Sequence, residues 1–173
     1  MFLKGEKITL RALEPEDLDF LFTTENDKTF WRVSNTQTPF SKYTLKKYLD
    51  NAHLDIYQIK QLRLVIVENK NDNAVGMIDL FDFDPQHKRA GVGILIHEKF
   101  QNTGFGSEAV SLLTSYCFNT LNLHQLFANI TPDNPKSISL FTKQGFVKMG
   151  EKKDWLFLDG DFKDEFIYQL INV

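Results

Sequence analysis

Cysteine is almost absent from the sequence: Cys117 stands alone, so no disulfide can form within the chain. A lone thiol is typical of proteins in a reducing compartment, and we therefore expect a cytoplasmic protein. Long hydrophobic runs are missing as well, because the stretch 91–96 is far shorter than the roughly 20 residues that cross a bilayer. The start of the chain has no apolar signal core either, so we expect no membrane partner.

An excess of positive charge is also lacking, because 20 Lys and Arg face 23 Asp and Glu, for a net charge of -3 and a pI near 5.8. Binding to a phosphate backbone needs a basic surface, so nucleic acid is not an expected partner. No linker, repeat or low-complexity tract divides the chain, which predicts a single domain over 1–173. Aromatic residues, in contrast, reach 13%, enough to line a pocket as well as a core.

The order of apolar and turn-forming residues predicts an α/β (α+β) fold with a mixed, mainly antiparallel sheet. Alternating or β-branched stretches indicate strands at 7–11, 62–68, 74–83, 89–96, 125–130, 146–157 and 163–171. Helical spacing and capping residues indicate helices after Pro15 and over 41–51, 104–120 and 135–144, whereas 23–40 is expected to be irregular. Gly91 and Gly93 within one strand indicate a bulge or a close approach of another backbone.

The segment 101–107, Gln-Asn-Thr-Gly-Phe-Gly-Ser, places two glycines where a loop enters a long helix. Uncovered N–H groups at a helix start attract anions, so this loop can bind a pyrophosphate, although glycines can also simply form the turn. A P-loop is disfavoured because Gly106 is followed by Ser107 and Glu108 rather than by lysine. A dinucleotide site remains a minor alternative, since the glycines do not follow a strand directly and no acid stands about 20 residues further on.

Five segments, in matching order, resemble the GNAT superfamily of N-acetyltransferases. The stretch 90–109 is similar to the coenzyme A site of that superfamily. The other four resemble the branch with spermidine acetyltransferases and ribosomal-protein N-terminal acetyltransferases, and they are His87-Lys88-Arg89-Ala90, Asn134-x-x-Ser137, the run 141–146 and Gly160-Asp161-Phe162-x-Asp164. The resemblance spans about residues 8–170 and is weakest over 23–60.

The resemblance implies a sheet of about seven strands with about four helices, splayed at a cleft for acetyl-CoA. A free strand edge there would pair with the amides of pantetheine, and the glycine loop would hold the pyrophosphate. The residues expected to contact the cofactor are Ile94, Leu95, Ile96, Gln101, Asn102, Thr103, Gly104, Phe105, Gly106, Ser107, Asn134, Ser137 and Phe141. Asn134 and Ser137 also suit ordinary roles at a helix start. Thr103 departs from the Lys or Arg often found at its position, and Phe141 departs from a tyrosine that can protonate the leaving thiolate.

The implied activity is transfer of an acetyl group from acetyl-CoA to a primary amine by direct attack. The resemblance favours Asp79 as proton acceptor, and a backbone N–H near Ile94 or Leu95, for which we choose Leu95, would stabilise the oxyanion. The acids expected to attract the amine are Glu25, Asp79 and Asp82, although single acids are more often solvated surface. The acceptor is expected to be a polyamine, another small amine or a protein N-terminus. The sequence leaves the oligomeric state open, and a homodimer is the commonest closed assembly.

Metal-dependent catalysis and covalent catalysis both lack the residues that they need in this sequence. His97 and Glu98 begin like a zinc-protease helix, but the second histidine is missing and no metal is expected. Cys117 lies on the apolar face of its predicted helix without a neighbouring base, so covalent catalysis is not expected. The absence of tyrosine at Phe141 keeps one alternative open, an acyl-CoA-binding or regulatory module of this fold with weak or no catalysis.

Overall fold

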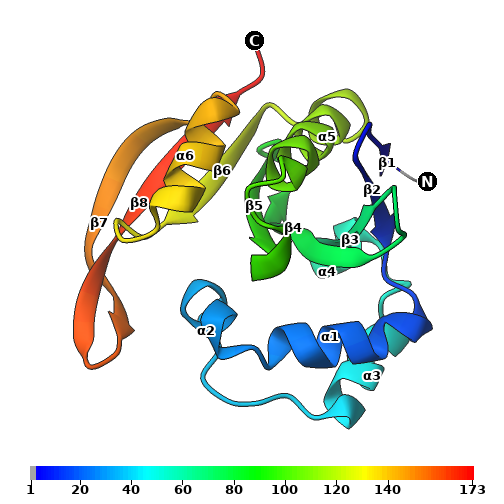
Figure 1. The fold of residues 1–173 in the computed structure, drawn as a ribbon. Helices are drawn as coiled ribbons and strands as arrows, with labels where there is room; N and C mark the ends of the chain where they lie inside the picture. The colour runs from blue at the N-terminus through cyan, green and yellow to red at the C-terminus, as the bar shows by residue number, and fades with distance from the viewer. Residues whose placement is uncertain (1–2) are drawn as a thin grey trace.

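The computed structural model describes residues 3–173, which form one eight-stranded sheet flanked by helices (Figure 1). The strands are β1 (Leu3–Lys4), β2 (Ile8–Ala12), β3 (Leu62–Glu68), β4 (Ala74–Asp84), β5 (Arg89–Ile96), β6 (Gln125–Ile130), β7 (Val147–Leu158) and β8 (Asp161–Ile171). The helices are α1 (Leu18–Glu25), α2 (Lys28–Ser34), α3 (Lys42–Asp50), α4 (Ile56–Ile59), α5 (Phe105–Asn119) and α6 (Pro135–Lys143), with 3₁₀ turns η1 (Pro15–Asp17) and η2 (Glu98–Phe100). The spatial order is β1-β2-β3-β4-β5-β6-β8-β7. Neighbouring strands run antiparallel except β5 and β6, so the predicted mixed α/β fold is confirmed.

The two faces of the sheet carry separate cores (Figure 1). Helices α5 and α6 cover one face, and the side chains that α5 buries are Phe105, Ala109, Val110, Leu113 and Cys117. Helices α1 and α3 cover the other face, where Leu21 and Leu45 pack with Met77 of β4. Successive residues of β5 divide between the cores, with Leu95 against α1 and α3 and Ile96 against α5, because side chains alternate along a strand.

The sheet opens between β5 and β6. These strands pair only where residues 89–91 face residues 125–127, and they separate beyond that point. At the separation, the ring of Phe81 crosses over Gly91 and packs edge-on against Phe127, with 5.5 Å between ring centroids. A Cβ atom at Gly91 would lie 2.3 Å from the Phe81 ring, so glycine is required there. Figure 1 shows β6, β8 and β7 diverging from the other strands as a result.

The bulge lies in β4 rather than in the glycine-containing β5. The register between these strands shifts between Phe81 and Asp84, and Asp82 within that stretch has a φ of 48°. The glycines of β5 serve a different purpose: Gly91 clears room for an aromatic ring, as described above. The expected close approach is therefore made by a side chain from the neighbouring strand.

The segment 23–40, expected to be irregular, contains helix α2. The Asp27 carboxylate begins the helix by accepting the Thr29 N–H at 2.9 Å. The helix itself reads Lys-Thr-Phe-Trp-Arg-Val-Ser and has few strong helix formers, so intrinsic propensity does not reveal it. No helix within the described residues is long and apolar enough to cross a bilayer.

Candidate active site

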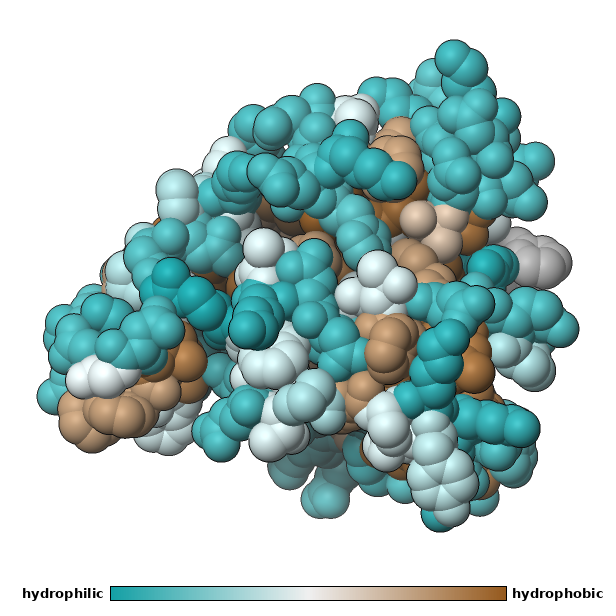
Figure 2. Space-filling view, turned by 60° about the horizontal axis from the view of Figure 1, so that its bottom comes forward, coloured by the Kyte–Doolittle hydropathy of each residue, from teal (hydrophilic) through white to brown (hydrophobic). Residues whose placement is uncertain are grey.

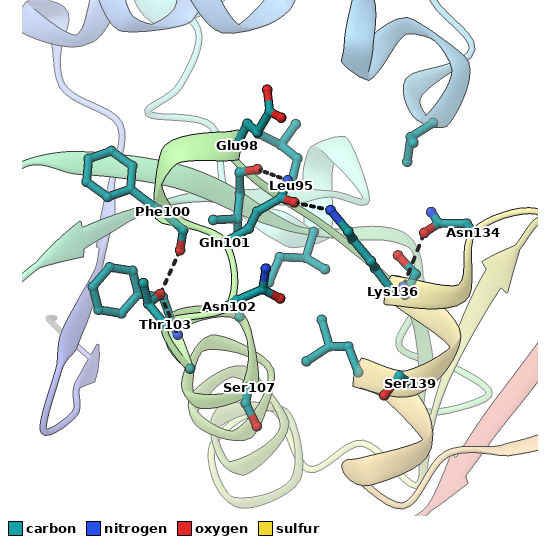
Figure 3. A pocket seen from close by; sticks show the side chains of 18 of the residues that line it. Leu95, Glu98, Phe100, Gln101, Asn102, Thr103, Ser107, Asn134, Lys136 and Ser139 are labelled. Atoms are coloured by element: carbon teal, nitrogen blue, oxygen red, sulfur yellow. Dashed lines mark hydrogen bonds between the residues drawn. The ribbon is translucent and has the colours of Figure 1, made fainter.

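A cavity of about 810 Å³ lies where β5 separates from β6 (Figure 3). Its walls come from the end of β5, the loop 101–107, the first turns of α6 and one side of α2. The predicted cofactor residues that line it are Ile94, Leu95, Ile96, Gln101, Asn102, Thr103, Gly104, Phe105, Gly106, Ser107, Asn134 and Ser137. Segments 94–107 and 134–137, separate in the sequence, thus meet around one space large enough for an extended ligand.

The edge of β5 presents backbone groups to this cavity from alternate residues. The His97 N–H donates to a β4 carbonyl at 2.9 Å, whereas the carbonyl of the preceding residue, Ile96, accepts from Gln101 Nε2 at 3.0 Å on the cavity side. Successive strand residues direct their backbone groups to opposite sides. The backbone N–H and carbonyl groups of Ile94 and Ile96 therefore point into the cavity, and those of Leu95 point toward β4. This alternation makes the Ile94 N–H, rather than the chosen Leu95 N–H, the donor on the open side.

The loop 101–107 brings bare backbone to the start of α5. Gly104 is the N-cap residue with a φ of 86°, a left-handed conformation that favours glycine. A Cβ atom at Gly106 would lie 3.5 Å from Leu140 and 3.8 Å from Ile96, both of which line the cavity. The absence of both side chains keeps the first N–H groups of α5 open to the cavity. A pyrophosphate fits this arrangement, because uncovered helix N–H groups bind anions.

Lys136 spans the cavity from α6 to the glycine loop (Figure 3). Its Nζ donates to Gln101 Oε1 at 2.8 Å, and Gln101 in turn holds the Ile96 carbonyl. At the start of α6, the Asn134 side chain accepts the Ser137 N–H at 3.2 Å, so Asn134 caps the helix as expected. Contact of Asn134 and Ser137 with the cofactor stays a prediction.

A second cavity of about 60 Å³ adjoins the first inside the opening of the sheet. Val33, Ile94, Asn134 and Ser137 line both. Phe141, expected to contact the cofactor, lies on the wall of this smaller cavity and is only 3% exposed. Its ring packs edge-on against Phe146, with 5.0 Å between centroids, so it holds α6 on its core as well as bordering the small cavity.

Two of the predicted substrate acids meet at one arginine. Arg63 of β3 donates from Nε and Nη2 to the two oxygens of Asp79, each at 2.9 Å, and from Nη1 to Glu25. Burial alone would lower the pKa of Arg63, but the adjacent charge of Asp79 and its hydrogen bonds outweigh burial and raise the pKa. With both oxygens engaged, Asp79 first serves to hold Arg63, and its role as proton acceptor stays a prediction. Asp82 is exposed at the β4 bulge, apart from this cluster.

One carboxylate at the opening was not expected. Glu165 of β8 is 8% exposed, lines the smaller cavity and pairs through Oε1 with Lys152 Nζ at 2.6 Å. Its signal in the sequence is an acid at an inward position of a strand, next to the apolar Phe166. That signal is weak, because antiparallel strands often carry charges on their solvent side, and the sequence alone does not show which side of β8 faces inward.

Nucleophilic and metal chemistry find no support among the described residues. Burial raises the pKa of the Cys117 thiol to about 12, so the thiol is protonated at neutral pH and sits in the core as predicted. No group of three or more His, Cys, Asp or Glu within residues 3–173 is placed to hold a metal ion.

Comparison with known proteins defines the class. Residues 7–147 match the family described as acetyltransferase (GNAT) domain, so the chain belongs to the GNAT family, and the predicted resemblance is confirmed. Membership in this family makes the chain an N-acetyltransferase that uses acetyl-CoA.

The relatives include enzymes of both expected kinds. The spermidine N(1)-acetyltransferase of Vibrio cholerae is 29% identical over 92% of this chain and 90% of that protein. The ribosomal protein uS5 alanine N-acetyltransferase of Escherichia coli is 34% identical, but over 46% of this chain and 41% of its own length. A crystal structure of Vibrio cholerae spermidine N-acetyltransferase with CoA and spermine superposes with a TM-score of 0.87 and 26% identity, covering 96% of both chains.

Proposed function

We propose that this chain acetylates a primary amine of a small polycation of the polyamine class. The observation that carries the proposal is the small cavity lined by the buried Glu165, which shares four lining residues with the large cavity. A polyamine bears several ammonium groups, so one amine can react while a neighbouring ammonium pairs with this carboxylate. Similarity to spermidine acetyltransferases over nine-tenths of the chain supports the same class of acceptor.

The large cavity is the proposed acetyl-CoA site. The Ile94 and Ile96 backbone edge would hold pantetheine, and the Gly104 to Gly106 turn would hold the pyrophosphate. When bound, acetyl-CoA supplies a thioester carbon that a neutral amine can attack. The Ile94 N–H would stabilise negative charge on the carbonyl oxygen. A thiol of ordinary pKa, about 8.5, is a tolerable leaving group near neutral pH, so the phenylalanine at 141 does not prevent transfer.

Turnover of an amine panel tests the proposed acceptor. The panel contains spermidine, spermine, an aminoglycoside, a neutral primary amine and a peptide with N-terminal alanine, and free CoA is measured. We expect the largest kcat/KM for a polyamine at low ionic strength, because opposite charges steer association. We expect Glu165→Gln to lower kcat/KM for that polyamine about tenfold, the value of one charge-assisted contact, with CoA affinity unchanged.

Glu151→Gln is the matched control, since Glu151 lies on the neighbouring strand β7 and lines neither cavity. Preference for the alanine peptide would instead favour a protein N-terminus, the acceptor named for the partly matching ribosomal-protein enzyme. CoA binding without turnover of any amine would favour the binding or regulatory module.

We also propose that the protein self-associates through the β7–β8 hairpin. Strand β7 ends the sheet, and large hydrophobic side chains gather on the hairpin near its tip, at the left of Figure 2. The exposed ones include Trp155, Phe157 and Phe162. A Vibrio cholerae spermidine acetyltransferase with a TM-score of 0.80 is described as dodecameric. Light scattering after gel filtration should give a multiple of 20.1 kDa, and Phe157→Ser should shift the mass toward the monomer.

A further inference from the structure

The glycine loop 101–107 contains no lysine or arginine, but a lysine from near the start of the chain lies beside it. The loop carries Thr103 between Asn102 and Gly104. Lys7, on the turn between β1 and β2, places its Nζ 3.3 Å from the Thr103 carbonyl. The same ammonium lies 3.0 Å from the point where a Cβ of Gly104 would stand. A positive charge therefore sits against the N-cap of α5, where the cavity is bounded by bare backbone.

The backbone of Lys7 is held on both sides. Its N–H donates to Glu108 Oε2 at 2.9 Å, and its carbonyl accepts the Asn69 N–H at 2.9 Å. The same Glu108 carboxylate accepts the N–H groups of Glu6 at 2.6 Å and Ile8 at 3.0 Å. Glu108 belongs to the first turn of α5, the helix whose start bounds the cavity. The β1–β2 turn is thus fastened to the helix that presents the loop, which fixes where the Lys7 side chain can reach.

The lysines that line the cavity itself come from the opposite wall. Lys136 and Lys143 both belong to α6, and Lys136 is engaged with Gln101 (Figure 3). Lys7 is exposed, and its bond to the Thr103 carbonyl uses one of the three donors of an ammonium. Two donors are left for an anion that reaches the start of α5.

We propose that Lys7 binds a phosphate group of the CoA moiety and supplies the charge that Thr103 does not. This inference rests on the proposed cofactor site. The phosphate is either the pyrophosphate on the glycine loop or the 3′-phosphate of the adenosine, and the two share the same chemistry toward an ammonium. Lys7 is a binding residue: its contact is made equally before and during acetyl transfer, so it raises affinity for acetyl-CoA without changing kcat.

Calorimetric titration tests the proposal on the full chain, with CoA, 3′-dephospho-CoA and phosphate-free pantetheine as ligands. We expect Lys7→Met to weaken CoA binding about tenfold and to flatten its salt dependence, and Lys7→Arg to restore most of the affinity. Pantetheine affinity should not change. Lys4→Met is the matched control, because Lys4 is exposed on β1 of the same hairpin, and it should bind CoA like the wild type.

The ligands also identify the phosphate. A loss with CoA that persists with 3′-dephospho-CoA assigns Lys7 to the pyrophosphate, and a loss that disappears assigns it to the 3′-phosphate. Equal CoA affinity in Lys7→Met and wild type, with unchanged unfolding midpoints, would overturn the inference and leave the cofactor site standing. An equal loss with pantetheine would overturn it too, since the effect would not involve phosphate. Absence of CoA binding by the wild type would overturn the site itself.

Discussion

The proposed cofactor site and the acids proposed to recognise the amine use charge in opposite ways. The cofactor side offers bare N–H groups at Gly104 and Gly106 and lysines with donors to spare. The acids proposed to recognise the amine are already tied to a base: the half-buried Asp79 and Glu25 to Arg63, and the buried Glu165 to Lys152. The first side is open to a ligand of opposite charge, whereas the second must exchange or share an internal partner to bind a cation. Affinity for CoA should therefore depend on single residues, and acceptor recognition on paired ones.

The largest expected effect comes from removing Arg63, the base that Asp79 and Glu25 share. Arg63→Met keeps the apolar stem of the side chain but leaves Asp79 and Glu25 together without their cation. Their side chains are 28% and 14% exposed, so we expect a loss of about 3 kcal/mol in the free energy of unfolding, measured in urea.

Arg89→Met is the matched control, because its pair with Asp84 is more exposed, and its cost should stay below about 1 kcal/mol. Adding Glu25→Gln and Asp79→Asn to Arg63→Met should recover much of the loss. A cost for Arg63→Met equal to that for Arg89→Met would show that the half-buried cluster contributes no more than a surface ion pair.

On the cofactor side, Gly106→Val should act on the ligand alone. The Cβ position contacts its neighbours at ordinary distances of 3.5 to 3.9 Å, so the free protein can accept it. The added methyl groups extend into the cavity, and we expect CoA affinity to fall about 100-fold, or about 2.7 kcal/mol, by titration. Ser111→Val on the exposed side of α5 controls for a β-branched residue in this helix. A parallel loss of stability in Gly106→Val would mean that the glycine serves packing.

The crossing of Phe81 over β5 offers a further test, because it lies where β5 and β6 stop pairing and the opening begins. Gly91→Ala places a Cβ 2.3 Å from the Phe81 ring and should cost about 2 kcal/mol, measured as a lower unfolding midpoint. Gly93→Ala, two residues along the same strand, meets that ring at 3.9 Å and should cost much less. Phe81→Leu should rescue Gly91→Ala. Equal costs at both glycines would point to strand flexibility instead of the ring.

The sequence was most informative where the site is local. The glycine loop and the start of its helix lie within seven residues, so their chemistry could be predicted without knowing the fold. Arg63, by contrast, pairs with Asp79 on the neighbouring strand β4 and with Glu25 on helix α1, and no spacing in the sequence predicts that all three meet. Helix α2 was missed because Phe30, Trp31 and Val33 have poor helix propensity, whereas the contacts of Phe30 with His97 and of Trp31 with the Glu25 carbonyl appear only in the fold. The position of Lys7 beside the glycine loop could not be predicted either, since Lys7 lies 96 positions before Thr103 in the sequence.

The smallest expected effect concerns His97, which joins α1 and α2 to the end of β5. Its Nε2 lies 2.9 Å from Thr24 Oγ1, and the rings of Phe20 and Phe30 pack edge-on to it, each at 5.5 Å between centroids. Burial lowers the pKa of His97; the charge of Lys99 also lowers it, and that of Asp27 opposes the shift.

An unfolded chain binds the imidazole proton near pH 6.5, but the folded protein binds it only at lower pH, so acid favours unfolding. Stability contributed by neutral His97 is thus present above pH about 6.5 and declines as the pH falls toward the folded pKa, by at most about 1.4 kcal/mol per pH unit. His97→Gln cannot titrate, so its urea stability should fall less than that of the wild type between pH 7.5 and pH 5. If the difference in stability between the two proteins is the same at both pH values, His97 titrates alike in the folded and unfolded states, and its aromatic surroundings serve packing alone.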